Sequence, residues 1–133
     1  MKLTHIPGKM VDLAWAQGAN SLEEACHEEC SIDQLKMLIA RDEKLLVRMD
    51  DEDKAVGWCV CYAVNLPNYR ILHVSHLVAH NAQFEKFYEL LKGVAVNLGC
   101  SRMRCCAQPA QSRLYQMKIG FKPVYETLEI KLI

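Results

Sequence analysis

The sequence predicts an α/β fold, a single domain over residues 1–133, with a mixed sheet and helices on both of its faces. Three observations support this prediction. The 133 residues are 51% hydrophobic, which is enough apolar material for one core. Three strand-like runs follow one another in the middle of the chain, and strand and helix patterns then alternate. A meander that leads into a β–α–β crossover gives a sheet of mixed direction.

The first third of the chain is expected to be mainly helical. Lys2–Ile6 alternates as a short strand, and the helical spacing of Met10–Gln17 follows it. A short helix is expected over Leu22–Glu28. Ser31 and Gln34 form the sequence pattern of a capping box, which predicts the start of a clearer helix. The apolar face of that helix comprises Ile32, Leu35, Leu38 and Ile39.

The middle of the chain predicts three strands with polar turns between them. The acidic run Asp50–Asp53 is expected to form a solvated turn. In the third strand, strict alternation places His73 on one face of the sheet and His76 on the other. The three predicted strands are Lys44–Met49, Ala55–Val64 and Arg70–Ala79.

The remainder of the chain predicts alternating helices and strands. Asn81 is expected to cap a long helix, and Gly99 to end it. Pro109 suits the first position of a second helix. The expected elements are a helix to Leu98, a strand over Arg102–Ala107, a helix to Ile119 and a closing strand over Pro123–Leu132. The whole order is therefore β-α-α-β-β-β-α-β-α-β.

Composition excludes several classes of function. Sixteen basic residues balance sixteen acidic ones, so no net field favours nucleic acid or an anionic membrane. No segment has the roughly 20 apolar residues that a membrane-spanning helix needs. The first ten residues lack a signal-peptide pattern, and seven cysteines are an odd number. We therefore expect a cytoplasmic protein without disulfides.

Motifs near the C-terminus resemble those of a known family. Arg113-Leu114-Tyr115 and Gly120-Phe121 match, in type and spacing, the last helix and following turn of the GNAT superfamily, the acetyl-CoA-dependent N-acetyltransferases. The order of elements is also the GNAT order, and the resemblance covers residues 45–133. It implies a GNAT-like fold and, for an active member, acetyl-CoA as cofactor.

The resemblance also implies where a cofactor would lie, and the sequence departs from the family there. The positions that correspond to the cofactor-binding main chain are Leu77, Val78, Asn81, Ala82 and Gln83. Family members carry a glycine-rich loop at this place, and it lets main-chain N–H groups approach a diphosphate.

In this chain no glycine lies between Gly57 and Gly93, and Glu85 falls in the first turn of the long helix. A carboxylate at that position would repel a diphosphate. We therefore expect no normal binding of acetyl-CoA.

The resemblance implies catalytic roles for three residues if the chain is an enzyme. Tyr115 corresponds to the general acid that protonates the leaving thiolate. His73 or His76 would be the base that deprotonates an amine, and Glu126 is a weaker candidate. The alternative is that Tyr115 only packs its helix on the sheet and that the histidines are hydrogen-bonded residues of the sheet.

Two cysteine patterns allow other chemistry. Cys26, His27 and Cys30 could share a zinc ion, but only two or three ligands are local and a tetrahedral site needs four. We therefore expect no metal. Cys105 with His73 on the neighbouring strand could form a nucleophilic pair, although no third residue is evident to orient it.

Two functional hypotheses remain open. In the first, the protein is a divergent GNAT-fold protein without normal acetyltransferase activity, acting through a protein partner or through self-association at an edge strand. It then resembles short GNAT-like proteins of tailed bacteriophages, which implies host cytoplasm or a virion as its location. In the second, it is an active N-acetyltransferase that acts on an amine.

Overall fold

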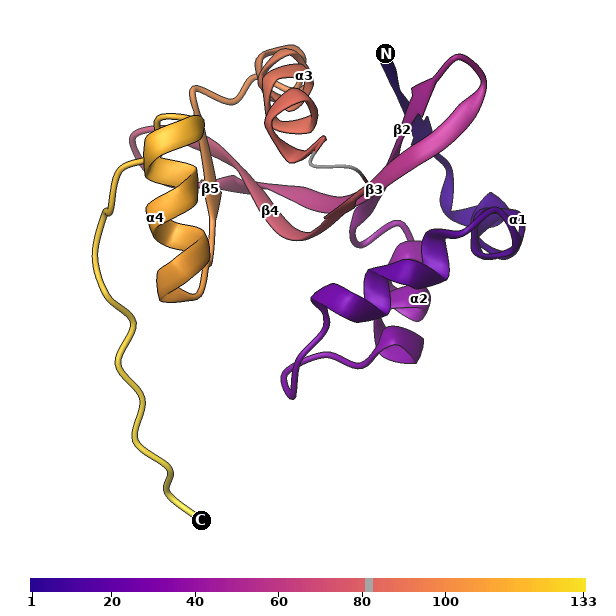
Figure 1. The fold of residues 1–133 in the computed structure, drawn as a ribbon. Helices are drawn as coiled ribbons and strands as arrows, with labels where there is room; N and C mark the ends of the chain where they lie inside the picture. The colour runs from indigo at the N-terminus through magenta and orange to yellow at the C-terminus, as the bar shows by residue number, and fades with distance from the viewer. Residues whose placement is uncertain (81–82) are drawn as a thin grey trace.

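A computed structural model describes residues 1–80 and 83–133 of the chain (Figure 1). It contains one sheet, four α-helices and two 3₁₀ turns in these residues. The elements in chain order are β1 (Lys2–Ile6), η1 (Gly8–Met10), α1 (Val11–Ala16), η2 (Ala19–Ala25), α2 (Ile32–Ala40), β2 (Leu45–Asp51), β3 (Lys54–Asn65), β4 (Arg70–Ala79), α3 (Phe84–Asn97), β5 (Arg102–Cys105) and α4 (Pro109–Lys118).

The sheet has five strands in the order β1-β2-β3-β4-β5. Neighbouring strands from β1 to β4 are antiparallel, whereas β4 and β5 are parallel because α3 connects them. Helices α1 and α2 lie against one face, and α3 lies against the other (Figure 1). The predicted mixed sheet with helices on both faces is confirmed.

Two core clusters fix these layers. On one face, here called the α3 face, buried side chains of β2, β3 and β4 pack against Phe87, Tyr88 and Leu91 of α3. On the other, the α2 face, Leu46, Trp58 and Val60 pack against the α1–α2 region. The sheet residues of the α3 face are Val47, Met49, Cys59, Cys61, Leu72 and Val74.

Local signals account for how α2 begins. Ser31 and Gln34 form the predicted capping box, with the Gln34 N–H donating to Ser31 Oγ at 3.2 Å.

The α-helix predicted over Leu22–Glu28 is wrong, since the chain forms the 3₁₀ turn η2 there. Gly18 precedes it with φ 117°, and the i→i+3 bond from Cys26 N to Glu23 O ends it.

The acidic run forms the turn between β2 and β3, as predicted. Its two central residues, Glu52 and Asp53, have φ of 49° and 67°, the left-handed backbone of the two-residue turns that suit a twisted hairpin. Asp50 departs from the prediction because it is 7% exposed rather than solvated. Its carboxylate forms an ion pair with Arg48, 2.8 Å from the guanidinium Nε.

A β-bulge in β4 overturns the predicted alternation. Val60 pairs with His76 and Cys61 pairs with Val74, so Ser75 is an extra residue on β4. The extra residue reverses the alternation of side chains beyond it. His73 and His76 consequently lie on the same face, the α2 face, instead of on opposite faces.

The predicted closing strand over Pro123–Leu132 is wrong. Residues 119–133 belong to no helix or strand, and the chain extends away from α4 as a single extended trace (Figure 1). The last main-chain hydrogen bonds of this region run from Gly120 and Phe121 to the carbonyl of Tyr115. The segment has the alternation of a strand, but it has no neighbouring strand to pair with.

Candidate functional site

The candidate site lies where β4 and β5 stop pairing. The parallel ladder joins Ile71–Val74 to Arg102–Cys105 and ends there, immediately before the bulge at Ser75. A bulge bends its strand and increases the local twist, so it accounts for the end of the ladder. Beyond it, the β5 side of Ser75–Ala79 offers main-chain N–H and C=O groups that an extended ligand could pair with.

His73 lies on the α2 face of β4 beside an aromatic residue of β3. Its ring centroid is 5.1 Å from that of Tyr62, and the Lys44 ammonium lies 4.7 Å from the Tyr62 ring centroid. Burial lowers the pKa of His73, and the positive charges of Lys44 and Arg104 lower it further. Tyr62 was not among the residues predicted for the site, although it directly follows Cys61 on β3 and therefore lies on the opposite face from Cys59 and Cys61.

His76 lies beyond the bulge with a defined orientation. The Ser75 hydroxyl lies 3.3 Å from the Val60 carbonyl, to which it can donate, and 2.8 Å from His76 Nδ1, and this contact orients the imidazole ring. The other ring nitrogen, Nε2, is buried without a partner among the described residues. Burial, followed by the charges of Lys44 and His27, lowers the pKa of His76 to about 4.

Tyr115 lies on the α3 face, across the sheet from both histidines. Its ring packs against those of Phe84, Tyr88 and Phe121, with centroids 5.9, 5.3 and 5.9 Å away. Burial raises the pKa of Tyr115 above its ordinary value. The structure therefore places His73 and His76 on one face of the sheet and Tyr115 in an aromatic cluster on the other.

The predicted cofactor-binding positions surround the end of β4 and the start of α3. Leu77 packs with the α3-face core and Val78 with the α2-face core. Asn81 and Ala82 lie outside the described residues. Gln83, rather than the predicted Asn81, precedes the first residue of α3, and it makes no side-chain capping bond.

The structure bears on two hypotheses about the cysteines, the Cys105–His73 pair and a metal site. Cys105 packs with the α3-face core, whereas His73 lies on the other face, so the hypothetical Cys105–His73 pair is wrong. The next residue, Cys106, acts on Tyr62 on the α2 face. Burial raises the pKa of Tyr62, and the negative charge of the Cys106 thiolate raises it further. The described residues contain no group of three side chains that could hold a metal.

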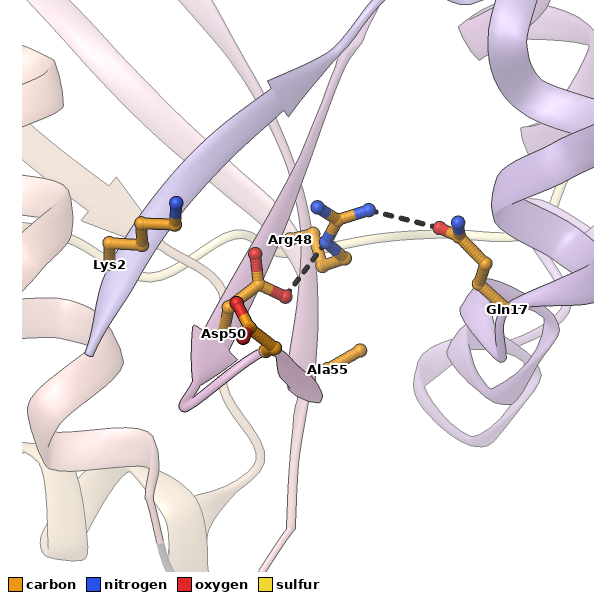
Figure 2. Close-up of a pocket in the computed structure, with 6 residues that line it drawn as sticks. Lys2, Gln17, Arg48, Asp50 and Ala55 are labelled. Carbon is orange, nitrogen blue, oxygen red and sulfur yellow. Dashed lines mark hydrogen bonds and ion pairs between the residues drawn. The ribbon is translucent and has the colours of Figure 1, made fainter.

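A polar hollow lies elsewhere, between the β2–β3 hairpin and the end of α1 (Figure 2). Arg48 spans it, with Nε 2.8 Å from Asp50 Oδ1 and Nη1 3.0 Å from Gln17 Oε1. Both contacts are internal, and they connect α1 to the sheet. We attribute a structural role to Arg48.

Comparisons with known proteins agree with this architecture. No protein-family model and no curated protein sequence matches the chain. Solved structures match over nearly all of it. A ribosomal-protein-alanine N-acetyltransferase from Brucella melitensis biovar Abortus 2308 has a TM-score of 0.73 at 14% identity, covering 99% of this chain and 100% of that one.

Two further structures match similarly. A probable acetyltransferase has a TM-score of 0.70 at 16% identity, covering 100% of this chain and 98% of that one. An aminoglycoside N-acetyltransferase in complex with CoA has a TM-score of 0.69 at 10% identity, covering 98% of this chain and 93% of that one. The chain therefore has the GNAT fold, as its sequence motifs indicated.

Within residues 1–80 and 83–133, no helix is both long enough and apolar enough to cross a membrane.

Proposed function

We propose that this GNAT-fold protein acts through a protein partner or through self-assembly, without ordinary acetyl transfer from acetyl-CoA. The observation that carries the proposal is the first turn of α3. Glu85 stands there as an exposed carboxylate, beside a partly buried Phe84. In this fold, the comparable helix start is where a coenzyme diphosphate would need main-chain N–H groups.

Charge at the helix start opposes a diphosphate. The N-terminus of a helix attracts anions because its first N–H groups and its dipole are positive. The negative charge of the Glu85 carboxylate offsets this positive potential and repels a second anion. In addition, no glycine lies in residues 58–92, so Cβ atoms limit how closely a phosphate approaches the main chain.

Packing around the predicted general acid supports the same proposal. The ring of Phe84, at the start of α3, lies 5.9 Å from that of Tyr115 on α4. Tyr88 and Phe121 complete the cluster, with centroids 5.2 Å apart. These contacts give Tyr115 a packing role, since its ring connects α4 to α3.

The histidines are poorly matched to an amine substrate. A general base works best when its pKa is near the working pH, and that of His76 is about 4. Such a base accepts a proton from an ammonium group with difficulty, because the pKa of an amine is about 10. That the protein is phage-encoded, and acts in the host cytoplasm or the virion, stays a prediction.

Thermal unfolding with acetyl-CoA tests the proposal. A ligand present at 100 times its dissociation constant stabilises the native state by about 2.7 kcal/mol, which raises Tm by roughly 10 °C for a domain of this size. We expect millimolar acetyl-CoA to change Tm by less than about 1 °C.

Two variants sharpen this test. Removing the charge in Glu85→Gln should allow weak acetyl-CoA binding in calorimetry, whereas Glu89→Gln, one turn further along α3, should not. A clear rise in the wild-type Tm, together with turnover that Tyr115→Phe abolishes without loss of binding, would overturn the proposal. It would establish an active N-acetyltransferase instead.

A further inference from the structure

Among the described residues, the most exposed large apolar side chains lie in the C-terminal segment, residues 122–133. Leu128, Ile130 and Leu132 are 86%, 81% and 87% exposed. The segment contacts the sheet at Tyr125, whose ring centroid lies 5.8 Å from the Arg104 guanidinium carbon on β5. Beyond that point it extends past α4 (Figure 1). Apolar groups gathered in this way mark an interaction surface.

The pattern of the segment is that of a strand with one apolar face. Leu128, Ile130 and Leu132 fall on one side, and Glu129 and Lys131 alternate with them on the other. Such a segment is stable only when another strand satisfies its main chain and an apolar surface covers its apolar face. The segment therefore needs a partner strand.

The neighbouring edge in the same chain is too short to be that partner. β5 is an edge of the sheet and has only four residues, Arg102–Cys105, which is about 13 Å of strand. The seven residues Thr127–Ile133 would span about 23 Å. The same segment in a second copy of the chain has the matching length.

Charge selects one register for such a pairing. When two copies pair antiparallel about Ile130, Glu129 of each copy faces Lys131 of the other, and Leu128 faces Leu132. Opposite charges directly across an antiparallel pair stabilise it, and like charges destabilise it. Because the dimer is two-fold symmetric, the same ion pair between Glu129 and Lys131 occurs twice.

Other registers are worse. Moving the axis to Glu129 places two carboxylates opposite each other, and moving it to Lys131 places two ammonium groups opposite each other. A slip of the pairing by one residue sets apolar side chains of one copy against polar ones of the other. The sequence is therefore self-complementary about Ile130.

Helix α4 offers apolar surface that could cover the paired segments. No residue of α4 is buried, and Leu114 and Met117, one turn apart, are 38% and 79% exposed. They are the exposed apolar side chains that most closely precede the segment in sequence. Cover of this kind is needed because a two-stranded ribbon alone is only marginally stable in water.

We propose that two copies of this chain form a two-fold dimer through residues 127–133, paired antiparallel about Ile130. This dimer is a specific form of the self-assembly proposed above, and it rests on that proposed function. The two can nevertheless fail separately. If the chain is a dimer and binds acetyl-CoA, only the proposed function is overturned. If the chain is a monomer and does not bind acetyl-CoA, only the dimer is overturned.

Sedimentation velocity of the full-length chain, up to about 100 µM, tests the dimer. We expect a concentration-dependent dimer. Ile130→Lys, which brings two ammonium groups together at the axis, should weaken it by about 100-fold or more. Glu129→Lys should weaken it about tenfold, and Lys131→Glu similarly, because each creates two like-charge pairs.

The charge exchange provides the decisive control. Combining Glu129→Lys with Lys131→Glu recreates opposite charges across the pair and should restore the wild-type dissociation constant to within about twofold. Glu126→Lys makes the same change in net charge as Glu129→Lys but lies outside the paired residues, and it should leave dimerisation unchanged.

Three results would overturn the dimer. The first is a wild-type chain that stays monomeric at about 100 µM. This result would overturn the dimer even if the segment resisted proteolysis, because the segment would then be protected by docking on its own chain. The second is an equal effect of Glu126→Lys and Glu129→Lys. The third is a double charge exchange that fails to restore association.

Discussion

Residues 1–100 and residues 101–133 differ in how their apolar side chains are used. Every side chain that is buried among the described residues lies at or before Cys100. In the later part, α4 has no buried residue and the C-terminal segment is exposed throughout. The first part forms the buried core, whereas the second adds strand β5 and only partly buried side chains, such as Tyr115, to that core. The dimer proposed above would bury the exposed apolar side chains of the C-terminal part.

The largest effect expected from this comparison comes from a matched pair of leucines. Leu91 on α3 is 0% exposed and Leu128 is 86% exposed. Leu91→Ala should lower the free energy of unfolding by about 3 kcal/mol, because it leaves a cavity. At concentrations where the chain is monomeric, Leu128→Ala should change it by less than about 0.5 kcal/mol. Urea unfolding followed by tryptophan fluorescence measures both, and equal losses would remove the distinction between the two regions.

The next effect is a dependence of stability on pH, located in the first part. The pKa of His76 is about 4 in the folded chain and about 6.5 when unfolded. Between these values the unfolded chain binds a proton that the folded chain does not. The free energy of unfolding should therefore fall as the pH drops from about 6.5 to about 4, by at most about 3 kcal/mol.

Substitutions identify the histidine responsible for that loss. His76→Gln removes the titrating group, so the fall in stability between pH 6.5 and 4 should become smaller, as measured by urea unfolding at several pH values. His80→Gln, at an exposed residue that follows β4, serves as the control. An unchanged pH dependence in His76→Gln would contradict the assignment.

The smallest effect compares two helix starts. In the first part, Ser31 Oγ accepts a bond of 3.2 Å from Gln34 N–H, and Ser31→Ala should lower the free energy of unfolding by about 1 kcal/mol. In the second part, the Gln108 N–H donates to Gln111 Oε1 at 3.4 Å. Gln111→Ala, which removes the acceptor, should have an effect below about 0.5 kcal/mol, because α4 contributes no buried residue. A larger loss in Gln111→Ala would show that α4 belongs to the cooperative core.

Periodicity in the sequence predicted most elements well. The bounds of β1 and β4 agree with the prediction, and so does the capping box at Ser31. These features depend on residues close together in the chain. The arrangement of His73 and His76 was mispredicted because a bulge depends on how β3 and β4 pair, which alternation within one strand does not reveal.

The candidate site was predicted only in part. The sequence singled out Tyr115, His73 and His76, but it did not indicate that the sheet separates the tyrosine from the histidines. It also missed Tyr62, whose contact with His73 comes from the β3–β4 register. Residues from different elements meet through tertiary packing, and no local pattern contains that information.

The sequence by itself determined the α/β class, the order of the main elements as far as α4 and the motifs that resemble the GNAT family, because these follow from hydrophobic periodicity and local capping. Only the tertiary structure decided that Ser75 is a bulge and that the strand-like C-terminal segment is unpaired. Alternation makes a segment able to form a strand, but a strand exists only where another main chain is available to bond with it.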